Sequence, residues 1–214
     1  MLRELADQSV GGVDGENGRW AEYLTHDETA EMVAIAPHGG QMEPGTAEQA
    51  LRVAALLDSC SGWAYCGYVD DGSARERYYT TSTAIALGDH ELLSRLADHT
   101  FDVAIAFHGY RPDGPHPDVY LGGTLDTSAR EVLAASIAQA SGLDVGVAQP
   151  KDGLKGDYGG VSDENIVNRL APRSVQLEQT DDARDSFRTE ICRGLADGIR
   201  QLDSRAGGRY DYSG

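Results

Sequence analysis

Short apolar runs alternate along the chain with segments whose apolar residues recur every three or four positions. The runs predict buried β-strands, and the helical spacing predicts amphipathic helices. We expect strands at 20–24, 32–36, 63–69, 77–87, 101–107, 119–122 and 174–178. We expect helices at 46–58, 89–98, 127–141, 165–170 and 182–202. This alternation predicts an α/β fold in which helices flank a mixed central sheet.

Capping residues mark where several of these helices are expected to begin. Thr46 is a predicted N-cap, and Gln49 three residues later completes a capping box. Thr127 and Ser162 are the predicted caps of two later helices. The Gly-, Asp- and Lys-containing stretch at 149–160 has the composition of a loop that covers a site.

The ends of the chain carry weaker patterns than its middle. Residues 1–31 are polar and irregular apart from the predicted edge strand. We expect residues 1–18 and 207–214 to be flexible, since disorder concentrates at the ends of a chain. The chain shows no internal repeat and no linker, so we expect a single domain spanning 1–214.

The charge balance is strongly acidic. The chain has 35 Asp and Glu against 18 Lys and Arg, a formal net charge of −17, and its two lysines are Lys151 and Lys155. Such a surface is typical of proteins that work in molar salt, where a Debye length of about 3 Å screens self-repulsion. An acidic protein of ordinary salt conditions is the alternative. Nucleic acid is excluded as a partner, because phosphate binding needs a basic face.

Apolar segments and cysteines bear on where the protein works. The chain has no run of about 18 apolar residues, so we expect no membrane span. Acidic residues occupy the N-terminus where an export signal needs an apolar core, which favours a cytoplasmic protein in a high-salt environment. Cys60, Cys66 and Cys192 are an odd set in apolar surroundings, which favours buried free thiols over a disulfide.

Chemically useful side chains stand at the ends of three predicted strands. His38 and Glu43 lie in a glycine-rich loop after one strand, while His108 and Glu178 each follow the end of another. If these strands are parallel neighbours, the four side chains meet at one edge of the sheet. Each of them alone is also typical of an ordinary turn or a helix-capping acid. Their coincidence at strand ends favours a site.

The residue types in this set suit zinc. Two histidines and one carboxylate leave a fourth tetrahedral position for water, which is the pattern of a catalytic zinc site. Zinc lowers the pKa of that water towards 7, and a carboxylate nearby accepts its proton. We expect one Zn²⁺ per chain, with Glu178 as the candidate base.

Four segments resemble the poly-γ-glutamate hydrolase family, whose fold is similar to that of the zinc carboxypeptidases. They are HGGQMEPGTAEQA at 38–50, FHGY at 107–110, ENIVNRL at 164–170 and VQLE at 175–178. The resemblance implies that His38, Glu43 and His108 bind zinc and that Glu178 is the general base. It also implies hydrolysis of the γ-amide bond between glutamate residues. The acidic stretch QTDDARDSFR after VQLE departs from the basic helix start that the family leads us to expect.

A polyanionic substrate needs cations near the metal. Arg111 and Arg169 are candidate substrate-binding residues, since a guanidinium matches a carboxylate bidentately. Asn168, beside Arg169, is a third candidate, although the carboxypeptidases place their Asn-Arg pair before the last zinc histidine and not after it. Ion pairing at the surface is the alternative role for both arginines.

Two other functions stay open at this point. One is a zinc amidase or peptidase acting on another anionic peptide, such as a cell-wall fragment or a γ-glutamyl conjugate. The other is a metal-binding module without catalysis, which would have no use for a base at Glu178. In either enzyme the partner is an anionic peptide, and we expect the protein to act as a monomer.

Overall fold

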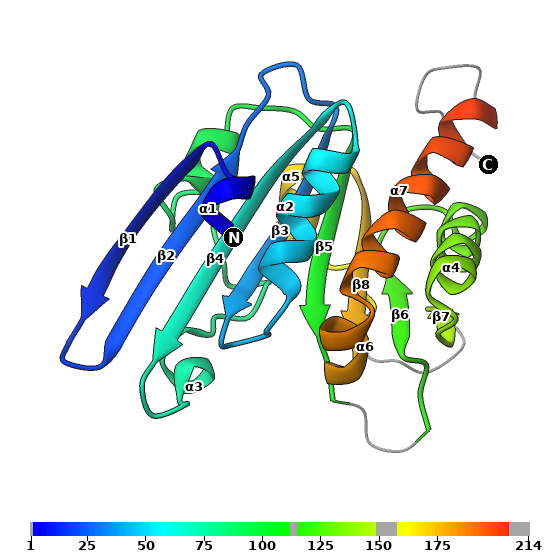
Figure 1. The fold of residues 1–214 in the computed structure, drawn as a ribbon. Coiled ribbons are helices and arrows are strands. Elements are labelled where there is room, and N and C mark those ends of the chain that lie inside the picture. The colour runs from blue at the N-terminus through cyan, green and yellow to red at the C-terminus, as the bar shows by residue number, and fades with distance from the viewer. Residues whose placement is uncertain (1, 112–114, 149–157, 206–214) are drawn as a thin grey trace.

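The computed structural model describes residues 2–111, 115–148 and 158–205. Within these residues, eight strands form one mixed sheet in the order β1-β2-β4-β3-β5-β8-β6-β7 (Figure 1). The strands are β1 (Gln8–Asp14), β2 (Gly18–Thr25), β3 (Met32–Gly40), β4 (Cys60–Val69), β5 (Val103–Gly109), β6 (Val119–Gly122), β7 (Val145–Val147) and β8 (Arg173–Gln179). The fold class predicted from the sequence is therefore confirmed.

The centre of the sheet is parallel and its margins are mixed. Strand β3 lies between β4 and β5 and runs parallel to both, and β8 continues the parallel set beyond β5. Strands β2 and β6 run antiparallel to β4 and β8, respectively. The carboxyl ends of β3, β4, β5 and β8 consequently meet at one edge, at the bottom of Figure 1. Side chains that leave these strand ends face a common space.

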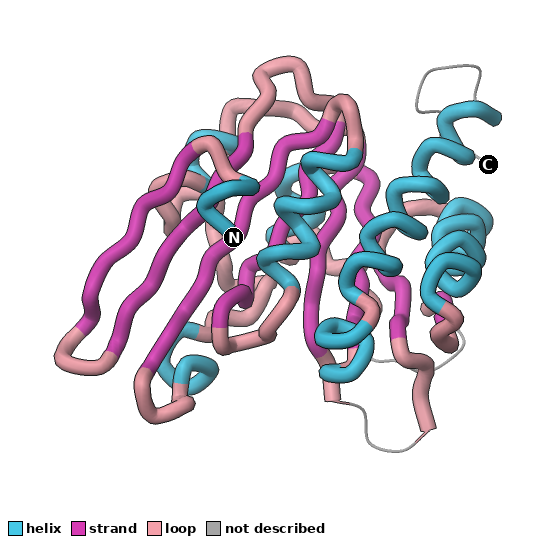
Figure 2. Tube along the Cα trace, viewed as in Figure 1, coloured by secondary structure: helices cyan, strands magenta, loops and turns pink. Residues whose placement is uncertain are grey.

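Helices cover both faces of the sheet. The helical elements are α1 (Leu2–Leu5), α2 (Thr46–Leu56), α3 (Ala74–Tyr78), the 3-10 turn η1 (Leu93–Leu96), α4 (Thr127–Ser141), α5 (Ile166–Leu170), α6 (Asp181–Ser186) and α7 (Arg188–Arg205). The long helices α2, α4 and α7 pack on one face, and α5 lies behind the sheet (Figure 2). No helix among the described residues is long and apolar enough to cross a membrane.

Two apolar clusters account for this layering. In β3, Met32 and Ala34 belong to the cluster under α2 and α7, whereas Val33 and Ile35 belong to the cluster under η1 and α5. This alternation is the two-residue period of a strand that is buried on both faces. It explains why the central strands are continuous apolar runs in the sequence.

The segment 77–87, predicted to be a strand, is not one. It begins in α3 and continues through turns. The neighbouring strand β4 already pairs with β2 on one side and with β3 on the other, so it has no free edge for a further strand. The predicted helix at 89–98 is likewise reduced to the turn η1, although Leu92, Leu93 and Leu96 are buried as expected.

The two ends of the chain also differ from expectation. The N-terminal region, expected to be irregular, forms α1 and β1, and β1 pairs along the outer side of β2. Strand β2 is therefore internal to the sheet. The predicted helix at 182–202 is two helices, α6 and α7, separated at Phe187.

Three predicted caps are wrong. Gly45, at a φ of 94°, precedes α2, while the hydroxyl of Thr46 donates to the carbonyl of Glu43. The side chain of Gln49 bonds to Gln179 instead of closing a capping box. Asp126 precedes α4 in place of Thr127, and Asn165 accepts from the backbone N–H of Val167 where Ser162 was predicted to cap α5.

Several other sequence predictions can be compared directly with the structure. The strand at 119–122 and the helix at 127–141 have the predicted bounds. Cys60, Cys66 and Cys192 are buried free thiols. The predicted covering loop lies largely outside the described residues.

Candidate metal centre

His38 reaches the sheet edge through an irregularity in β3. Between Ala36 and Gly39, β3 advances three residues while β4 advances two, from Ala64 to Cys66. The extra residue is a bulge, which turns a side chain away from its regular direction. A Cβ atom on Gly39 would lie 2.8 Å from the Sγ atom of Cys66, so a glycine is needed for this close approach. The bulge and the glycine together aim His38 into the site.

Glu43 returns to His38 through a tight turn. The backbone N–H of Glu43 donates to the carbonyl of His38 at 2.8 Å, and the carbonyl of Glu43 accepts the hydroxyl of Thr46 at 2.8 Å. One carboxylate oxygen of Glu43 also accepts the backbone N–H of Gly109 at 2.9 Å. The turn therefore holds the Glu43 carboxylate against the end of β5.

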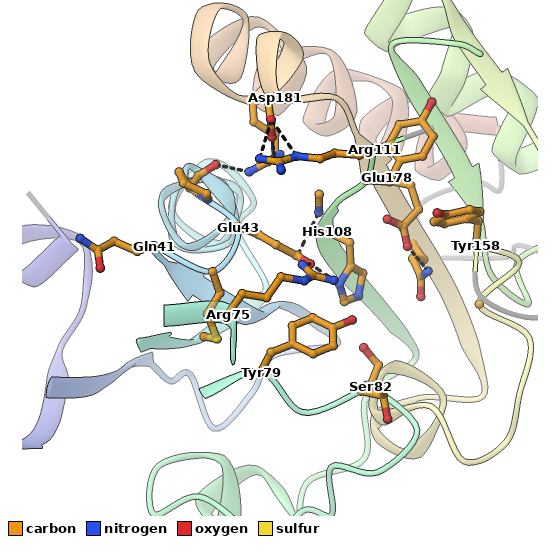
Figure 3. A pocket seen from close by; sticks show the side chains of 18 of the residues that line it. Gln41, Glu43, Arg75, Tyr79, Ser82, His108, Arg111, Tyr158, Glu178 and Asp181 are labelled. Atoms are coloured by element: carbon orange, nitrogen blue, oxygen red, sulfur yellow. Dashed lines mark hydrogen bonds and ion pairs between the residues drawn. The ribbon is translucent and has the colours of Figure 1, made fainter. Parts of the chain in front are cut away.

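His108 and Glu178 come from neighbouring parallel strands. They are register partners of β5 and β8, and register partners present their side chains to the same face of a sheet. Both side chains are buried, and both line the same cavity (Figure 3). The sequence prediction that these strand ends converge is confirmed.

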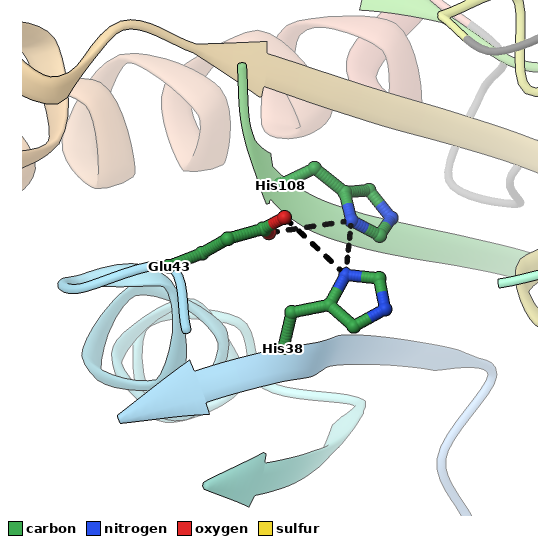
Figure 4. A group of neighbouring side chains, drawn as sticks. All are labelled: His38, Glu43 and His108. Atoms are coloured by element: carbon green, nitrogen blue, oxygen red, sulfur yellow. Dashed lines mark hydrogen bonds and ion pairs between the residues drawn. The ribbon is translucent and has the colours of Figure 1, made fainter. Parts of the chain in front are cut away.

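The side chains of His38, Glu43 and His108 meet at the centre of this site (Figure 4). The Nδ1 atoms of the two histidines are 3.2 Å apart. Nδ1 of His38 lies 3.5 Å from Oε1 of Glu43, and Nδ1 of His108 lies 3.6 Å from Oε2. A tetrahedral zinc with bonds of about 2.0 to 2.2 Å holds its donors about 3.3 to 3.6 Å apart. The spacing of the three side chains fits that metal.

Hydrogen bonding prepares His38 to act as a ligand. Its Nε2 atom lies 2.7 Å from the carbonyl of Thr80, which can only accept, so Nε2 carries the proton and Nδ1 presents a lone pair. An outer carbonyl partner of this kind is the usual companion of a metal-binding histidine. The lone pair faces Nδ1 of His108 at 3.2 Å, so either a proton on that nitrogen or a cation shared by both can satisfy it.

The protonation states also suit a metal. Burial lowers the pKa of His108, although the neighbouring Glu43 carboxylate opposes this shift. Burial alone would raise the pKa of Glu43, but contacts with His108 and His38 outweigh it and hold that pKa below its usual range. A neutral imidazole and an ionised carboxylate are the forms that bind a metal.

Glu178 has a different environment from Glu43. Burial, followed by the negative charge of Glu43, raises its pKa well above that of an ordinary carboxyl. The side chain of Gln176 donates to Glu178 at 2.6 Å. A carboxyl with a raised pKa beside a metal site has the properties of a general base or acid.

The site opens into a cavity of about 880 Å³. Its described lining mixes four arginines with five acids, namely Arg75, Arg111, Arg184 and Arg188 beside Glu43, Glu178, Asp181, Asp182 and Asp185. Each of these arginines pairs with one of the acids. The side chain of Arg111 is 87% exposed and pairs with Asp181 at 3.1 Å. Arg111 therefore lies at the cavity, and its role in substrate binding stays a prediction.

Asn168 and Arg169 do not belong to this site. Neither is among the described residues that line the cavity. Asn168 donates to the carbonyls of Gly160 and Ser162, and Arg169 donates to the carbonyl of Ile85. The physical reason is the position of α5 against the sheet, where these side chains hold loops in place. Their predicted role in substrate binding is not supported.

Two site residues were missed by the sequence predictions. Tyr79 lies in the segment 77–87 that was predicted to be a strand, and Arg75 lies just before it. The ring of Tyr79 stacks on His38 with centroids 4.1 Å apart, and the guanidinium of Arg75 lies 4.0 Å from the Tyr79 ring centroid. Arg75 also pairs with Glu43 at 3.3 Å. Only the folded arrangement brings this segment over the strand ends.

Comparison with known proteins agrees with this architecture. A bacteriophage poly-gamma-glutamate hydrolase structure is 25% identical, with a TM-score of 0.65 over 92% of this chain and 93% of that one. The zinc-free apo form of YndL is 21% identical, with a TM-score of 0.64 over 85% and 89%. A metallo-carboxypeptidase from Burkholderia cenocepacia, at 12% identity and a TM-score of 0.53 over 94% and 68%, has a similar fold.

Sequence comparison points the same way. The SPbeta prophage-derived UPF0714 protein YoqZ of Bacillus subtilis (strain 168) is 29% identical over 173 residues. The match covers 80% of this chain and 57% of YoqZ, so the chain spans little more than half of that relative. The family profile described as poly-gamma-glutamate hydrolase matches residues 11–196, from β1 into α7. Because this match covers most of the chain, including His38, Glu43 and His108, the chain belongs to the poly-gamma-glutamate hydrolase family.

Proposed function

We propose that this protein is a zinc-dependent hydrolase that cleaves the γ-glutamyl amide bonds of poly-γ-glutamate. The observation that carries the proposal is the convergence of two imidazole nitrogens and one carboxylate within 3.6 Å of one another. Membership of the family supports the substrate class. The zinc-free state named for YndL supports zinc as the metal.

His38, Glu43 and His108 hold the metal in this proposal. When bound, zinc supplies a Lewis acid that polarises the scissile carbonyl and acidifies the attacking water. The chain contributes the fixed directions of the donors. The carbonyl of Thr80 keeps the proton of His38 on Nε2, and the N–H of Gly109 keeps the Glu43 carboxylate facing both histidines.

Glu178 moves the proton. Its carboxylate accepts a proton from the attacking water and passes it to the amine that leaves. Burial favours its neutral form, so it holds the proton between these two events. Gln176 donates to one oxygen of Glu178 and thereby limits the directions that the carboxylate can take.

Arg75 and Arg111 bind the substrate's free carboxylates. Each residue of poly-γ-glutamate keeps an α-carboxylate, and a guanidinium matches it with two parallel hydrogen bonds. The side chains of Arg75 and Arg111 are 56% and 87% exposed, and both line the cavity. They stand close enough to solvent to exchange their present partners for substrate.

Metal analysis combined with an activity assay tests this proposal. The purified protein should contain about one zinc per chain and should shorten poly-γ-glutamate, and a chelator should abolish the cleavage. His38→Ala and His108→Ala should each lose both metal and activity. His99→Ala is the matched control, since its Nε2 also lies 2.7 Å from a backbone carbonyl, that of Ala30. It should keep both properties.

Two results would overturn the proposal at different levels. If the wild-type protein neither contains nor takes up a stoichiometric metal, the assignment of a metal centre is wrong. If the protein binds zinc and cleaves another anionic peptide but not poly-γ-glutamate, only the substrate assignment is wrong.

A further inference from the structure

A buried arginine lies beside the metal centre. Arg184, on α6, is only 4% exposed, although arginine is normally a surface residue. Its Nη1 atom donates to the carbonyl of Pro44 at 2.6 Å, and its Nε atom donates to the carbonyl of Gln179 at 3.3 Å. It also pairs with Asp181 at the start of its own helix.

The same guanidinium packs on the end of β5. A Cβ atom placed on Gly109 would lie 2.5 Å from the Cζ atom of Arg184, so the guanidinium rests directly against the Gly109 backbone. Arg184 thus contacts Pro44, Gly109 and Gln179. These residues directly follow Glu43, His108 and Glu178, respectively.

We propose that Arg184 is the positioning residue that holds the two metal-ligand segments and the base segment in their relative places. This inference rests on the proposed function, because it concerns the same metal and the same base. Arg184 acts through the backbone that follows each side chain. Its removal should therefore weaken zinc binding and misplace Glu178 while leaving all three ligands and the base in the sequence.

Direct contacts among these segments would transmit such a displacement. The N–H of Gly109 donates to the carboxylate of Glu43 at 2.9 Å, and the N–H of Tyr110 donates to the carbonyl of Gln179 at 2.9 Å. A shift of one segment relative to another stretches these bonds. Metal donors spaced within a few tenths of an ångström of the tetrahedral distance lose affinity on such a shift.

Arg130 is the matched control for a purely structural role. It is also buried, lies on α4 and donates to the carbonyls of Leu125 and Ala148 at 2.9 and 3.0 Å. It is not among the described residues that line the cavity. Losing its hydrogen bonds should destabilise the fold without acting on the metal centre.

The first experiment compares Arg184→Lys with Arg130→Lys. Lysine keeps the charge but cannot reach two carbonyls and a glycine with one planar group. Zinc affinity is measured by competition with a chromophoric chelator, and the melting temperature is measured on the metal-free proteins. Arg184→Lys should lower zinc affinity by about 10-fold or more, whereas Arg130→Lys should leave it within about twofold. Equal zinc affinities for Arg184→Lys and the wild type would overturn the inference.

A second experiment displaces Arg184 without changing it. Gly109→Ala adds a methyl group where the guanidinium now lies, and the end of a long side chain can move aside. We expect zinc affinity to fall as in Arg184→Lys. In an Arg184→Ala background, Gly109→Ala should have little further effect, because both substitutions remove the same contact. Additive losses in this double-mutant cycle would contradict the role of Arg184.

These measurements separate the inference from the proposed function. A wild-type protein that binds no zinc overturns the proposed function, and the inference falls with it. A wild-type protein that binds zinc, beside an Arg184→Lys variant that binds it equally well, overturns the inference alone. Turnover at saturating zinc gives one more readout, and a fall in kcat with KM unchanged is expected from a misplaced Glu178.

Discussion

At the scale of single residues, two buried carboxylates with opposite properties define the site. Both Glu43 and Glu178 lie within the cavity lining, and each is almost fully buried. Glu43 stays ionised because His108 and His38 contact it, whereas Glu178 has a raised pKa because burial and the charge of Glu43 act on it. Two carboxyls held in different environments can take the separate roles of ligand and base.

The substitution Glu178→Gln should separate these roles. Glutamine keeps the shape and can still accept the hydrogen bond from Gln176, but it cannot accept a proton. We expect zinc content and fold to survive while turnover falls by about 10²- to 10⁴-fold. Metal analysis and initial rates on poly-γ-glutamate measure the two effects. Loss of zinc would make Glu178 a ligand, and near-normal turnover with metal bound would remove it as the base.

The same substitution should stabilise the metal-free protein at neutral pH. The folded state raises the pKa of Glu178, so between the unfolded and folded pKa values only the folded state holds the proton. Stability that depends on Glu178 therefore falls as pH rises through this window. The melting temperature of Glu178→Gln in EDTA should exceed that of the wild type at pH 7, and the gain should shrink towards pH 4.

An exposed carboxylate is the control for this pH effect. Glu91 pairs only with Arg95 at the surface, at 3.8 Å among the described contacts, and Glu91→Gln should change the melting temperature little between pH 4 and 7. If Glu178→Gln is less stable than the wild type at pH 7, then burying the charged form of Glu178 does not destabilise the fold as expected.

At the scale of elements, the turn before α2 determines where Glu43 lies. Gly45 has a φ of 94°, which side chains rarely adopt, and a Cβ atom there would lie 2.9 Å from the backbone oxygen of Arg184. The turn is thus packed on α6 as well as being left-handed. A glycine meets both requirements, so the start of α2 depends on tertiary packing more than on a side-chain cap.

Gly45→Ala and Gly142→Ala should differ in their effects. Gly142 ends α4 at a φ of 75° with nothing within 4 Å of its Cβ position, so alanine there adds only conformational strain. We expect Gly142→Ala to lower the free energy of unfolding by about 1 kcal/mol and Gly45→Ala by about 2 to 4 kcal/mol. Urea denaturation measures both. Equal losses would mean that the contact with α6 yields easily.

At the scale of the whole molecule, the chain carries a formal net charge of −17. The surface acids repel one another in dilute buffer, and salt screens that repulsion. We expect the melting temperature to rise steeply between about 0.1 and 2 M KCl. If the melting temperature does not change with KCl, the protein is acidic but its stability does not depend on high salt.

A charge-reduced variant controls for effects of salt that do not depend on charge. Glu28, Asp98 and Glu131 are exposed, and none of them lines the cavity among the described residues. Replacing all three with their amides should make the melting temperature depend less on KCl. An unchanged salt dependence would assign the effect to the hydrophobic core.

The sequence alone predicts the α/β class, the central strands and the three candidate metal-donor residues. These follow from local information, because a strand buried on both faces must be apolar throughout and strand-end residues such as His38 and His108 inherit their positions from it. The helix at 127–141 was predictable for the same reason, since its buried residues recur with helical spacing.

Tertiary structure decided what depends on partners distant in the chain. Residues 77–87 have strand-forming side chains, but β4 offers them no free edge, so they cover His38 instead of extending the sheet. Nothing in the sequence distinguishes Arg184 from other arginines, because its role depends on α6, which packs it against Pro44 and Gly109. Composition and periodicity report the secondary structure that a segment favours by itself. Strand pairing, side-chain packing and the identity of the residues that line the cavity depend on contacts between segments that are distant in the sequence.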